Sequence, residues 1–454
     1  MAGRKKSRRH DMDGTRQLDD AAREDTRRAI DAVWRLEEPK IIAALTRLVH
    51  DLSFAEDLAH DALVAALKQW PLEGIPVNPG AWLMAAAKHR AIDMLRRQAL
   101  ISRKNETLAR DIDATINETA ALEAAIDDDI GDNLLRLIFV ACHPVLPAEG
   151  RVALTLRLVG GLTTEEIARA FTVPEPTVAQ RIVRAKRTLA KARVPFEVPH
   201  GSERFARLAS VLDVVYLVFN EGYSATAGNH WVRPVLCDEA LRLGRILAEL
   251  APREAEVHGL VALMELQSSR LRTRIGPKGD AVRLLDQDRS RWDQLLITRG
   301  LTALGKAEML AGDAPGSYTI EAAIAACHAR ARFAEDTDWQ RIAILYAALA
   351  DATASPVIRL NHAVAVGMAE GPAKGLALVD ALLAEGVLRS YHYAPSVRGD
   401  LLEKLGRYAE ARAEFERAAD LAKNAREHEL LTARACACAE RAAPDGHSTS
   451  HVEV

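Results

Sequence analysis

Two carboxylates stand four residues apart in the segment AEDLAHDALVAALKQW, residues 55–70. On an α-helix this spacing places Asp57 and Asp61 on one face. A stripe of apolar residues lies beside them: Leu58, Ala62, Leu63 and Ala66. Neighbouring carboxylates can act as a general acid and base when a cleft shifts their pKa values. The same pair can instead form the polar edge of a surface that docks on another protein.

No nucleophile–base or metal pattern surrounds the two aspartates, which favours the docking surface and predicts no catalytic residues. The five cysteines are odd in number and sit in alanine-rich helical surroundings, so they do not form a disulfide framework. The pairs at 141–144 (ACHP) and 436–438 (CAC) lack a second pair at ligand spacing. We therefore expect no metal, no cofactor and no enzymatic activity.

Length and composition are typical of a soluble protein with two or three domains, because the 454 residues are 49% hydrophobic and 27% charged. No run approaches the eighteen or so apolar residues of a membrane span, and the N-terminus lacks the apolar segment of a secretion signal. We expect a cytoplasmic protein without membrane contact. The net charge of −3 argues against a wholly basic nucleic-acid-binding protein.

Charge is nevertheless distributed unevenly along the chain. Basic clusters occur at 3–10, 87–98 and 181–193, and a strongly acidic segment covers 110–133. Apolar residues recur at spacings of three and four nearly everywhere, which predicts an all-α fold. Proline-bearing breaks occur at 71–80, 173–176 and 194–202.

The segment GLTTEEIARAFTVPEPTVAQRIVRAKRTLAKA, residues 161–192, predicts two helices joined by a tight turn. Thr163 or Thr164 is suited to cap the first helix, and Thr177 to start the second. The second helix has a buried stripe of Val178, Ile182, Ala185 and Leu189. This arrangement is typical of a helix-turn-helix, whose second helix enters the DNA major groove.

The exposed face of that second helix is basic. Gln180 and Arg181 are near its N-terminal end, where base edges are read, and four further residues suit phosphates: Arg184, Lys186, Arg187 and Lys191. A solvated basic face on an ordinary α-hairpin is the alternative. A second basic helix over 78–98 favours DNA binding, because two separated basic helices suit a protein that reads a bipartite promoter.

Three blocks of the sequence resemble regions 2 and 4 of extracytoplasmic-function (ECF) sigma factors of bacterial RNA polymerase, in order and spacing. They are AEDLAHDALVAALKQW, AWLMAAAKHRAIDMLRR and LPAEGRVALTLRLVGGLTTEEIARAFTVPEPTVAQRIVRAKRTLAK. The resemblance covers about residues 27–195. It implies a factor that directs core polymerase to promoters and aids melting, with the β′ clamp, the β flap and promoter DNA as partners.

The resemblance also implies roles for particular residues. The residues implied to contact core polymerase are Asp57, Leu58, Asp61, Ala62 and Leu63. The elements implied to capture minus-ten bases are the loop 71–80 and the residues Lys88, His89, Arg90, Arg96 and Arg97. The residues implied to bind the minus-thirty-five element are Thr177, Gln180, Arg181, Arg184, Lys186, Arg187 and Lys191.

The C-terminal half shows the spacing of a tetratricopeptide repeat. In residues 401–422, the turn and second-helix positions are Gly406, Tyr408, Ala411, Phe415 and Ala418. The unit at 360–383 fits less well, with Gly375 and Val379 in register only if the turn starts at Glu370. The longer chain thus resembles the ECF subgroup with a C-terminal tetratricopeptide-like extension.

The expected architecture is all-α: a region 2 helical bundle, a linker, a region 4 helix-turn-helix and a tetratricopeptide-like repeat domain. The expected boundaries are a disordered basic tail at 1–26, region 2 at 27–100, an acidic linker at 101–132, region 4 at 133–195, the repeat domain at 203–442 and a disordered tail at 443–454.

Polar and aromatic residues concentrate at three places in the C-terminal half, and we expect regulatory contacts with a ligand or a protein partner there. The candidates are Asn220, Tyr223, Asp286, Asp288, Arg289 and Asp293. Buried salt bridges and helix caps are the alternative role for these residues. For the whole chain, the alternative to a sigma factor is a stand-alone helix-turn-helix regulator with a sensing repeat domain.

Overall fold

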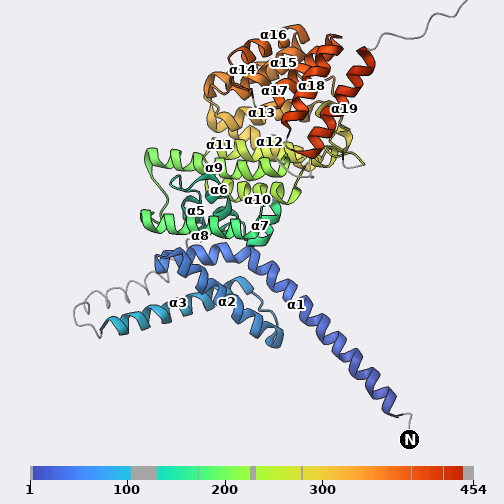
Figure 1. The fold of residues 1–454 in the computed structure, drawn as a ribbon. Coiled ribbons are helices and arrows are strands. Elements are labelled where there is room, and N and C mark those ends of the chain that lie inside the picture. Colours follow the sequence, from blue (N-terminus) through green and yellow to red (C-terminus); the bar gives the residue numbers. More distant parts are fainter. Residues whose placement is uncertain are drawn as a thin grey trace, which may run out of the picture. The chain divides into compact units, whose positions relative to one another are not determined.

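The computed structural model describes the backbone of residues 4–103, 130–171, 173–224, 232–277, 280–389, 391–422 and 424–442. Across these residues the regular elements are helices, and an isolated β-bridge joins Ile275 and Ala281. The all-α fold expected from the sequence is confirmed (Figure 1). Most of the acidic linker and the tail from residue 443 lie outside the described residues.

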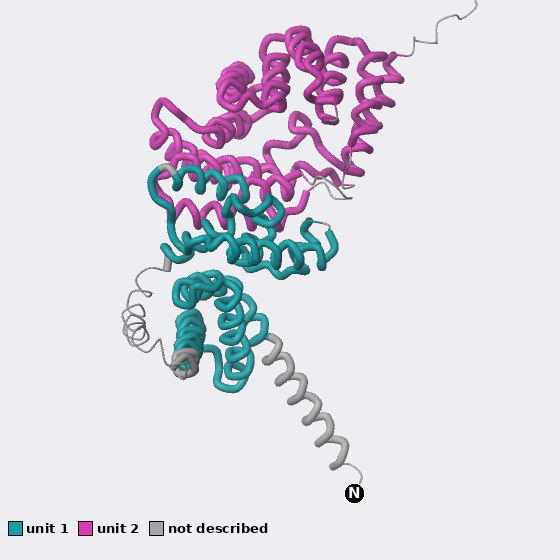
Figure 2. The backbone as a smooth tube through the Cα atoms, turned by 60° about the vertical axis from the view of Figure 1, so that its left-hand side comes forward, with its two compact units in different colours: residues 1–214 teal, residues 215–454 magenta. Residues whose placement is uncertain are grey.

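The chain divides into an N-terminal unit, residues 1–214, and a C-terminal unit, residues 215–454 (Figure 2). The division falls inside α9 (Gly201–Tyr223) and not in the proline-bearing segment 194–202. The first half of α9 belongs to the N-terminal unit because its side chains bond there. Arg207 donates to the carbonyl oxygen of Phe139 at 3.0 Å, and Ser210 donates to that of Cys142 at 2.7 Å.

The first three helices pack against one another as a bundle: α1 (Arg4–Val49), α2 (Leu52–Glu73) and α3 (Pro79–Arg103). Their contact is made by small and branched side chains, among them Ile41, Leu45, Ala59 and Leu83, which are at most 1% exposed. Asp51 caps α2 by accepting a hydrogen bond from the backbone N–H of Phe54 at 2.9 Å.

Helix α1 begins at Arg4, whereas the sequence analysis expected a disordered tail up to residue 26. Once the packed turns from Ile30 onward are formed, each further residue adds a hydrogen bond without a new nucleation cost, so a helix can extend beyond its packed part.

Four more helices complete the N-terminal unit together with the start of α9. They are α5 (Ile130–Ala141), α6 (Ala148–Leu158), α7 (Thr164–Phe171) and α8 (Glu175–Ala192). Leu137, Leu154 and Leu156 are fully buried among them, which gives this group an apolar interior of its own.

The C-terminal unit consists of helices that pack mostly against their neighbours in the chain. They are α10 (Pro234–Leu250), α11 (Ala255–Ser268), α12 (Gln294–Ala311), α13 (Ser317–Arg330), α14 (Trp339–Thr353), α15 (Pro356–Ala369), α16 (Pro372–Ala384), α17 (Tyr393–Lys404), α18 (Tyr408–Leu421) and α19 (Ala425–Ala442). Three short 3₁₀ turns lie between α11 and α12: Leu271–Thr273, Leu284–Asp286 and Arg289–Arg291.

Glycines permit close helix contacts at two places in this unit. A Cβ atom on Gly375 of α16 would lie 2.7 Å from the Cα atom of Gly367 in α15, so the two helices touch backbone to backbone. Between α17 and α18, Gly406 has a positive φ of 73°, which a side chain would strain. These are the positions where the repeat spacing requires small or turn residues.

Candidate nucleic-acid interface

Helices α7 and α8 form the helix-turn-helix that the sequence predicts. Thr163 caps α7 by a reciprocal pair of bonds with Glu166: the N–H of Glu166 donates to Thr163 Oγ1 at 3.1 Å, and the N–H of Thr163 donates to Glu166 Oε2 at 2.9 Å. Hydrogen bonds from Thr163 and Arg35 lower the pKa of Glu166, although its partial burial opposes them. Ile167 and Ala168 face inward.

Helix α8 buries the predicted stripe of Val178, Ile182, Ala185 and Leu189. It begins at Glu175, two residues before the expected start at Thr177, because Pro176 suits the first turn, where an N–H is not needed. Gln180, Arg184, Arg187 and Lys191 are exposed, while Thr177, Arg181 and Lys186 are half-buried. Arg184, Arg187 and Lys191 form no ion pair within the described residues.

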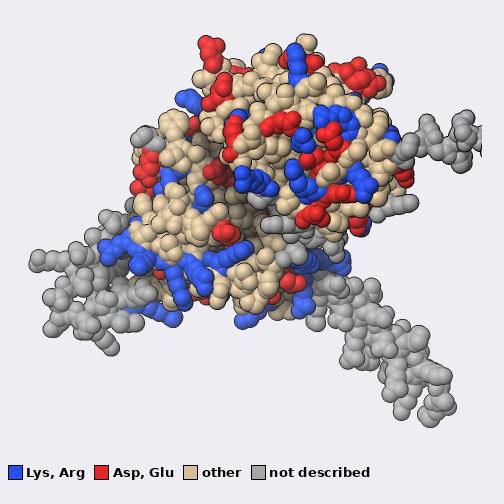
Figure 3. Space-filling model, turned by 45° about the horizontal axis from the view of Figure 1, so that its top comes forward, with Lys and Arg blue, Asp and Glu red and all other residues tan. Residues whose placement is uncertain are grey.

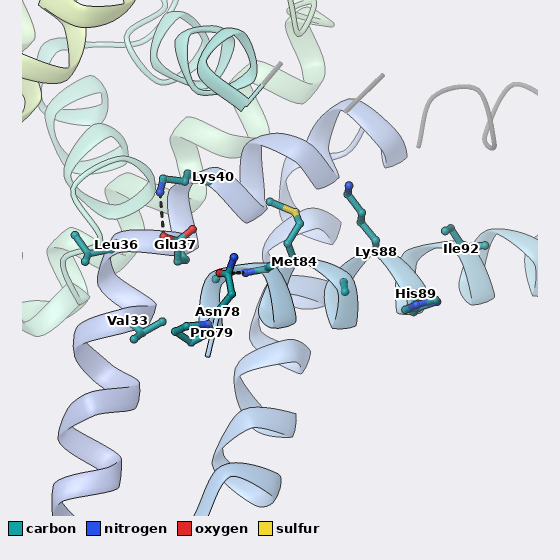
Figure 4. A pocket seen from close by; sticks show the side chains of 13 residues that line it. Val33, Leu36, Glu37, Lys40, Asn78, Pro79, Met84, Lys88, His89 and Ile92 are labelled. Atoms are coloured by element: carbon teal, nitrogen blue, oxygen red, sulfur yellow. Dashed lines mark hydrogen bonds and ion pairs between the residues drawn. The ribbon is translucent and has the colours of Figure 1, made fainter. Parts of the chain in front are cut away.

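Helix α3 carries the second basic face. His89, Arg96 and Arg97 are exposed, and Lys88 and Arg90 are half-buried. Lys88 and His89 line a cavity of about 760 Å³ between α3 and α1. Figure 4 shows Met84 and Lys88 pointing from α3 toward the side on which Lys40 of α1 lies.

The cavity also contains residues of α1 that the sequence analysis did not identify. Lys40 forms an ion pair with Glu37 at 3.0 Å, and Leu36 is 62% exposed. The Glu37 side chain of α1 lies against the start of α3, since a Cβ atom on Gly80 would lie 2.8 Å from Glu37 Cδ. No signal in the sequence marked these residues, because the exposure of Leu36 is visible only in the folded chain.

The loop between α2 and α3 exposes three apolar residues, Leu72, Ile75 and Val77. Asn78 ends the loop by accepting a hydrogen bond from the N–H of Ala81 at 3.1 Å, which caps α3. Apolar side chains held in water beside a basic helix form a surface on which unstacked bases can lie.

The proposed docking edge of α2 is only partly exposed. Asp57 and Asp61 are exposed and Leu63 is half-buried, but Leu58 is 3% exposed and Ala62 is fully buried. Both buried residues pack in the bundle because they lie on the stripe that α2 turns toward α1 and α3. We therefore remove Leu58 and Ala62 from the docking surface. Val64 and Leu67, which are not among the predicted docking residues, are exposed apolar residues of the same helix.

Models of two families match this part of the chain: "Sigma-70 region 2" at residues 33–101 and "Sigma-70, region 4" at residues 136–189. RNA polymerase sigma-H factor of Pseudomonas aeruginosa is 30% identical over 192 residues, which cover 39% of this chain and 93% of that protein. The chain belongs to the ECF-type RNA polymerase sigma factors. A probable ECF sigma factor of Mycobacterium tuberculosis is 24% identical over 185 residues, which cover 40% of this chain and 61% of that protein.

The rest of the chain has a relative without an assigned function. An uncharacterized protein of Rhizobium meliloti is 46% identical over 400 residues, which cover 88% of this chain and 93% of that protein. A family of unknown function (DUF6596) matches residues 207–308. The long extension is thus shared with a relative, whereas its tetratricopeptide-like character stays a prediction.

Sigma factors in general are DNA-binding initiation factors and not enzymes, whereas the role of Asp57 and Asp61 in docking stays a prediction. Cys142 is buried with its Sγ 3.2 Å from Thr155 Oγ1, and burial raises the pKa of its thiol to about 12. In the part of the chain that the structure describes, no group of three acidic, histidine or cysteine side chains could hold a metal, and no helix is suited to cross a bilayer.

Regions 2 and 4 contact each other through ion pairs. Glu56 of α2 pairs with Lys186 of α8, and Arg35 of α1 donates to Glu166 of α7 at 2.5 Å. Lys186, one of the predicted phosphate contacts, is therefore engaged by the helix that carries the docking edge. The sequence offered no signal for these pairs, because their members are about 130 residues apart.

A third pair is the most buried. Glu38 Oε1 of α1 lies 3.3 Å from Arg157 Nη2 of α6, and the two side chains are 2% and 17% exposed. Burial raises the pKa of the Glu38 carboxyl, although Arg157 pulls in the opposite direction. Taking charges out of water costs more than an ordinary ion pair returns, so removing one partner is expected to be costly.

The candidate regulatory residues of the C-terminal unit are mostly engaged in local structure. Asp293 caps α12 through the N–H groups of Leu295 and Leu296 at 3.0 and 3.1 Å. Asp288 accepts from Ser290, and Asp286 pairs with Arg283 at 2.6 Å. For these three aspartates, the alternative role of caps and salt bridges agrees with the observed contacts.

Tyr223 and Arg289 contact residues far from them in the chain. Tyr223 is 8% exposed, and Arg274 Cζ stands 3.8 Å from the centre of its ring, a cation–π contact. Asn220 is half-buried on α9. Arg289 is 7% exposed and bonds across the chain to residues near 330.

Charged side chains are distributed differently over the molecule. Figure 3 shows lysine and arginine gathered in a band at the lower left of the face in view, whereas acidic and basic side chains mix over its upper part. A band of one sign is suited to follow a polyanion, while mixed charge is typical of a solvated surface.

The salt dependence of DNA binding tests the exposed face of α8. We expect replacement of Arg184 and Arg187 by Ala to weaken promoter binding by the holoenzyme and to reduce the slope of log K against log salt by about one unit per lost phosphate contact. The control is the double change Arg412→Ala and Arg426→Ala in the C-terminal unit, which removes the same charge. An unchanged slope for the α8 variant would mean that these arginines are merely solvated.

The contact between regions 2 and 4 is tested by Arg157→Ala. Glu38 then lacks its cation, and we expect the free energy of unfolding to fall by about 3 kcal/mol at neutral pH. Because the pKa of Glu38 is raised in the folded protein, the loss should be smaller at low pH, where the carboxyl is protonated, and should grow as pH rises through that pKa.

Urea unfolding at several pH values measures both effects. The matched control is Arg169→Ala, which removes an exposed ion pair with Glu165 and should change stability by less than about 0.5 kcal/mol. Similar losses in the two variants, or a loss independent of pH, would contradict the role given to Glu38.

Proposed function

We propose that this sigma factor reads bipartite promoters with α3 and α8 and docks on the β′ clamp of core polymerase through the exposed edge of α2. The observation that carries the proposal is the pair of basic helix faces on α3 and α8, each within a matched sigma-factor region. The alternative of a stand-alone regulator has no need for an exposed acidic edge on α2.

At the minus-ten element, α3 and the preceding loop bind the non-template strand. Lys88, Arg96 and Arg97 supply cations for phosphates, with His89 and Arg90 beside them. The exposed Leu72, Ile75 and Val77 offer an apolar surface to bases that leave the duplex. The cavity between α1 and α3 has a volume in the range of small-ligand pockets, and so is large enough for one such base.

At the minus-thirty-five element, the N-terminal part of α8 enters the major groove. Gln180 and Arg181, next to Thr177, reach base edges, and Arg184, Arg187 and Lys191 contact phosphates. Lys186 joins them only after it leaves Glu56, so promoter binding competes with the contact between regions 2 and 4. Region 4 also binds the β flap.

The docking edge has a charge-based test that avoids buried positions. We expect Asp57→Arg together with Asp61→Arg to weaken binding to core polymerase at least about 100-fold, because opposed like charges at an interface cost several kcal/mol. Both residues are exposed, so the fold should persist. Asp31→Arg, on the exposed side of α1, is the control, and co-purification with core polymerase is the measurement. Equal retention of the two variants would rule out this edge of α2.

We further propose that the C-terminal unit is a tetratricopeptide-like scaffold that sets sigma activity through a ligand or a protein partner. Two helix pairs, α15–α16 and α17–α18, support the repeat assignment, since each joins its helices at a glycine and buries small residues between them. A scaffold attached directly to α9 has a high effective concentration at the promoter readers.

Removal of the C-terminal unit tests this control. A truncation after His200 would delete Arg207 and Ser210, which bond within the N-terminal unit, so the cut belongs after Val214. We expect residues 1–214 and the full chain to differ in promoter-specific run-off transcription with purified core polymerase alone.

Circular dichroism of the truncated protein checks that it is folded. Equal output from both proteins would reject control within the chain and favour recruitment of another protein. Absence of a promoter-specific transcript from both the folded residues 1–214 and the full chain would overturn the sigma function itself.

A further inference from the structure

A cavity of about 610 Å³ lies within the C-terminal unit, between the segment 285–297 and the turn after α13 at 329–335. Its walls are apolar and aromatic at Leu285, Trp292, Ile297 and Phe333. Its size falls in the range of small-molecule sites, which are typically apolar with a few polar groups that fix the ligand. The lining segment 285–297 lies within residues 207–308, which the family of unknown function matches.

Arg289 is a buried cation on this wall. Its guanidinium donates to the carbonyl oxygens of His328 and Ala331 at 3.0 and 3.1 Å and to Thr337 Oγ1 at 2.9 Å. These partners are neutral. No carboxylate pairs with Arg289 among the described residues, and its Nε atom lacks a hydrogen bond there.

Such a charge is costly, because buried cations are ordinarily paired with anions. Burial and the nearby Arg270 lower the pKa of Arg289, and Asp336 and Glu335 oppose this shift without forming an ion pair. The neighbouring His328 adds no negative charge, since burial and the two arginines lower its pKa to about 3 and leave the ring neutral.

Trp292 presents a second unmatched donor beside Arg289. The residue is 4% exposed, and its Nε1 atom has no hydrogen-bond partner in the described part of the chain. Its ring centre lies 5.2 Å from Arg289 Cζ. An indole N–H and a guanidinium can only donate, so whatever satisfies both must be an acceptor.

Three arginines and two acids line the cavity, so its charged side chains sum to one net positive charge. Arg330 and Arg332 line it and form no ion pair with any described residue. Of the two acids at the rim, Asp288 is bonded to the N–H and hydroxyl of Ser290 at 3.0 and 2.6 Å. Arg332 Cζ stands 5.6 Å from the centre of the exposed Phe333 ring, a cation–π contact that leaves the N–H groups of the guanidinium without a carboxylate partner among the described residues.

We propose that this cavity binds a small organic anion, whose phosphate or carboxylate oxygens accept from Arg289, Trp292 and the rim arginines while an apolar or planar body packs on Phe333. An anion satisfies the unmatched donors and compensates the buried charge in one step. The site belongs to the C-terminal unit alone, and its existence does not rest on the proposed transcription function.

Phenyl phosphate is a suitable probe, with benzoate as the carboxylate form and phenol as the neutral control. We expect titration calorimetry on the full-length protein to show saturable binding of one or both anions and none of phenol. Trp292→Phe keeps an aromatic ring, although a smaller one, and removes the indole N–H, and Arg332→Gln removes a rim charge from an exposed position. Each should weaken binding about five-fold or more.

Arg299→Gln is the matched control, because Arg299 is exposed on α12 and does not line the cavity. Its affinity should equal that of the unaltered protein. The change Arg289→Gln is not needed for the test, since Arg289 also ties the turn at 328–337. Absence of binding by both anions at 10 mM, or equal affinity in the Trp292→Phe, Arg332→Gln and Arg299→Gln variants, would overturn the proposal.

Discussion

Each helix of this protein buries one stripe of small and branched side chains, and this burial decides which residues remain to make other contacts. On α8 the buried stripe runs through Val178, Ile182, Ala185 and Leu189, so the arginines between them are turned outward. On α2 the same constraint takes Leu58 and Ala62 into the bundle and leaves Asp57 and Asp61 at the surface. The residues available to bind DNA or a protein partner are therefore those that helix packing leaves exposed.

Charge at the contact between regions 2 and 4 introduces a second constraint. Glu38 and Glu56 are nearly buried, and each has a basic partner on a region 4 helix. Under the proposed promoter contact of α8, Lys186 has two competing anions, the carboxylate of Glu56 and a DNA phosphate. The ion pair with Glu56 is partly buried, so salt screens it less than it would screen an exposed pair.

Charged side chains of the C-terminal unit fall into two groups, those with a nearby partner and those without a partner of opposite charge. Most of its acidic groups are matched locally, as where Asp293 caps α12 or where Arg359 and Glu385 bond at 2.6 and 2.7 Å. Arg289 differs, because carbonyl oxygens orient it but supply no full negative charge. A guanidinium positioned in this way is pre-organised for an anion, since little side-chain entropy remains to be lost on binding.

The sequence alone determined the features that depend on neighbours within a few residues. The helical class, the capping box of Thr163 and Glu166, the stripe of α8 and the turn at Gly406 all follow from a period of 3.6 residues and from local hydrogen bonds. Family-like spacing then identified regions 2 and 4. Within α8, only the start was misplaced, by two residues.

Two features were decided only by the tertiary structure. They are which apolar residues of a helix become buried and which charged residues form ion pairs. Leu58 and Leu63 look equivalent in sequence, yet the bundle buries one more deeply than the other. Glu38 and Arg157 are far apart in the chain, and nothing local indicates that they pair. The division of the chain inside α9 has the same origin, because Arg207 and Ser210 bond to carbonyl groups that only folding brings to them. Periodicity is a property of short segments, whereas burial and charge pairing are properties of the packed chain.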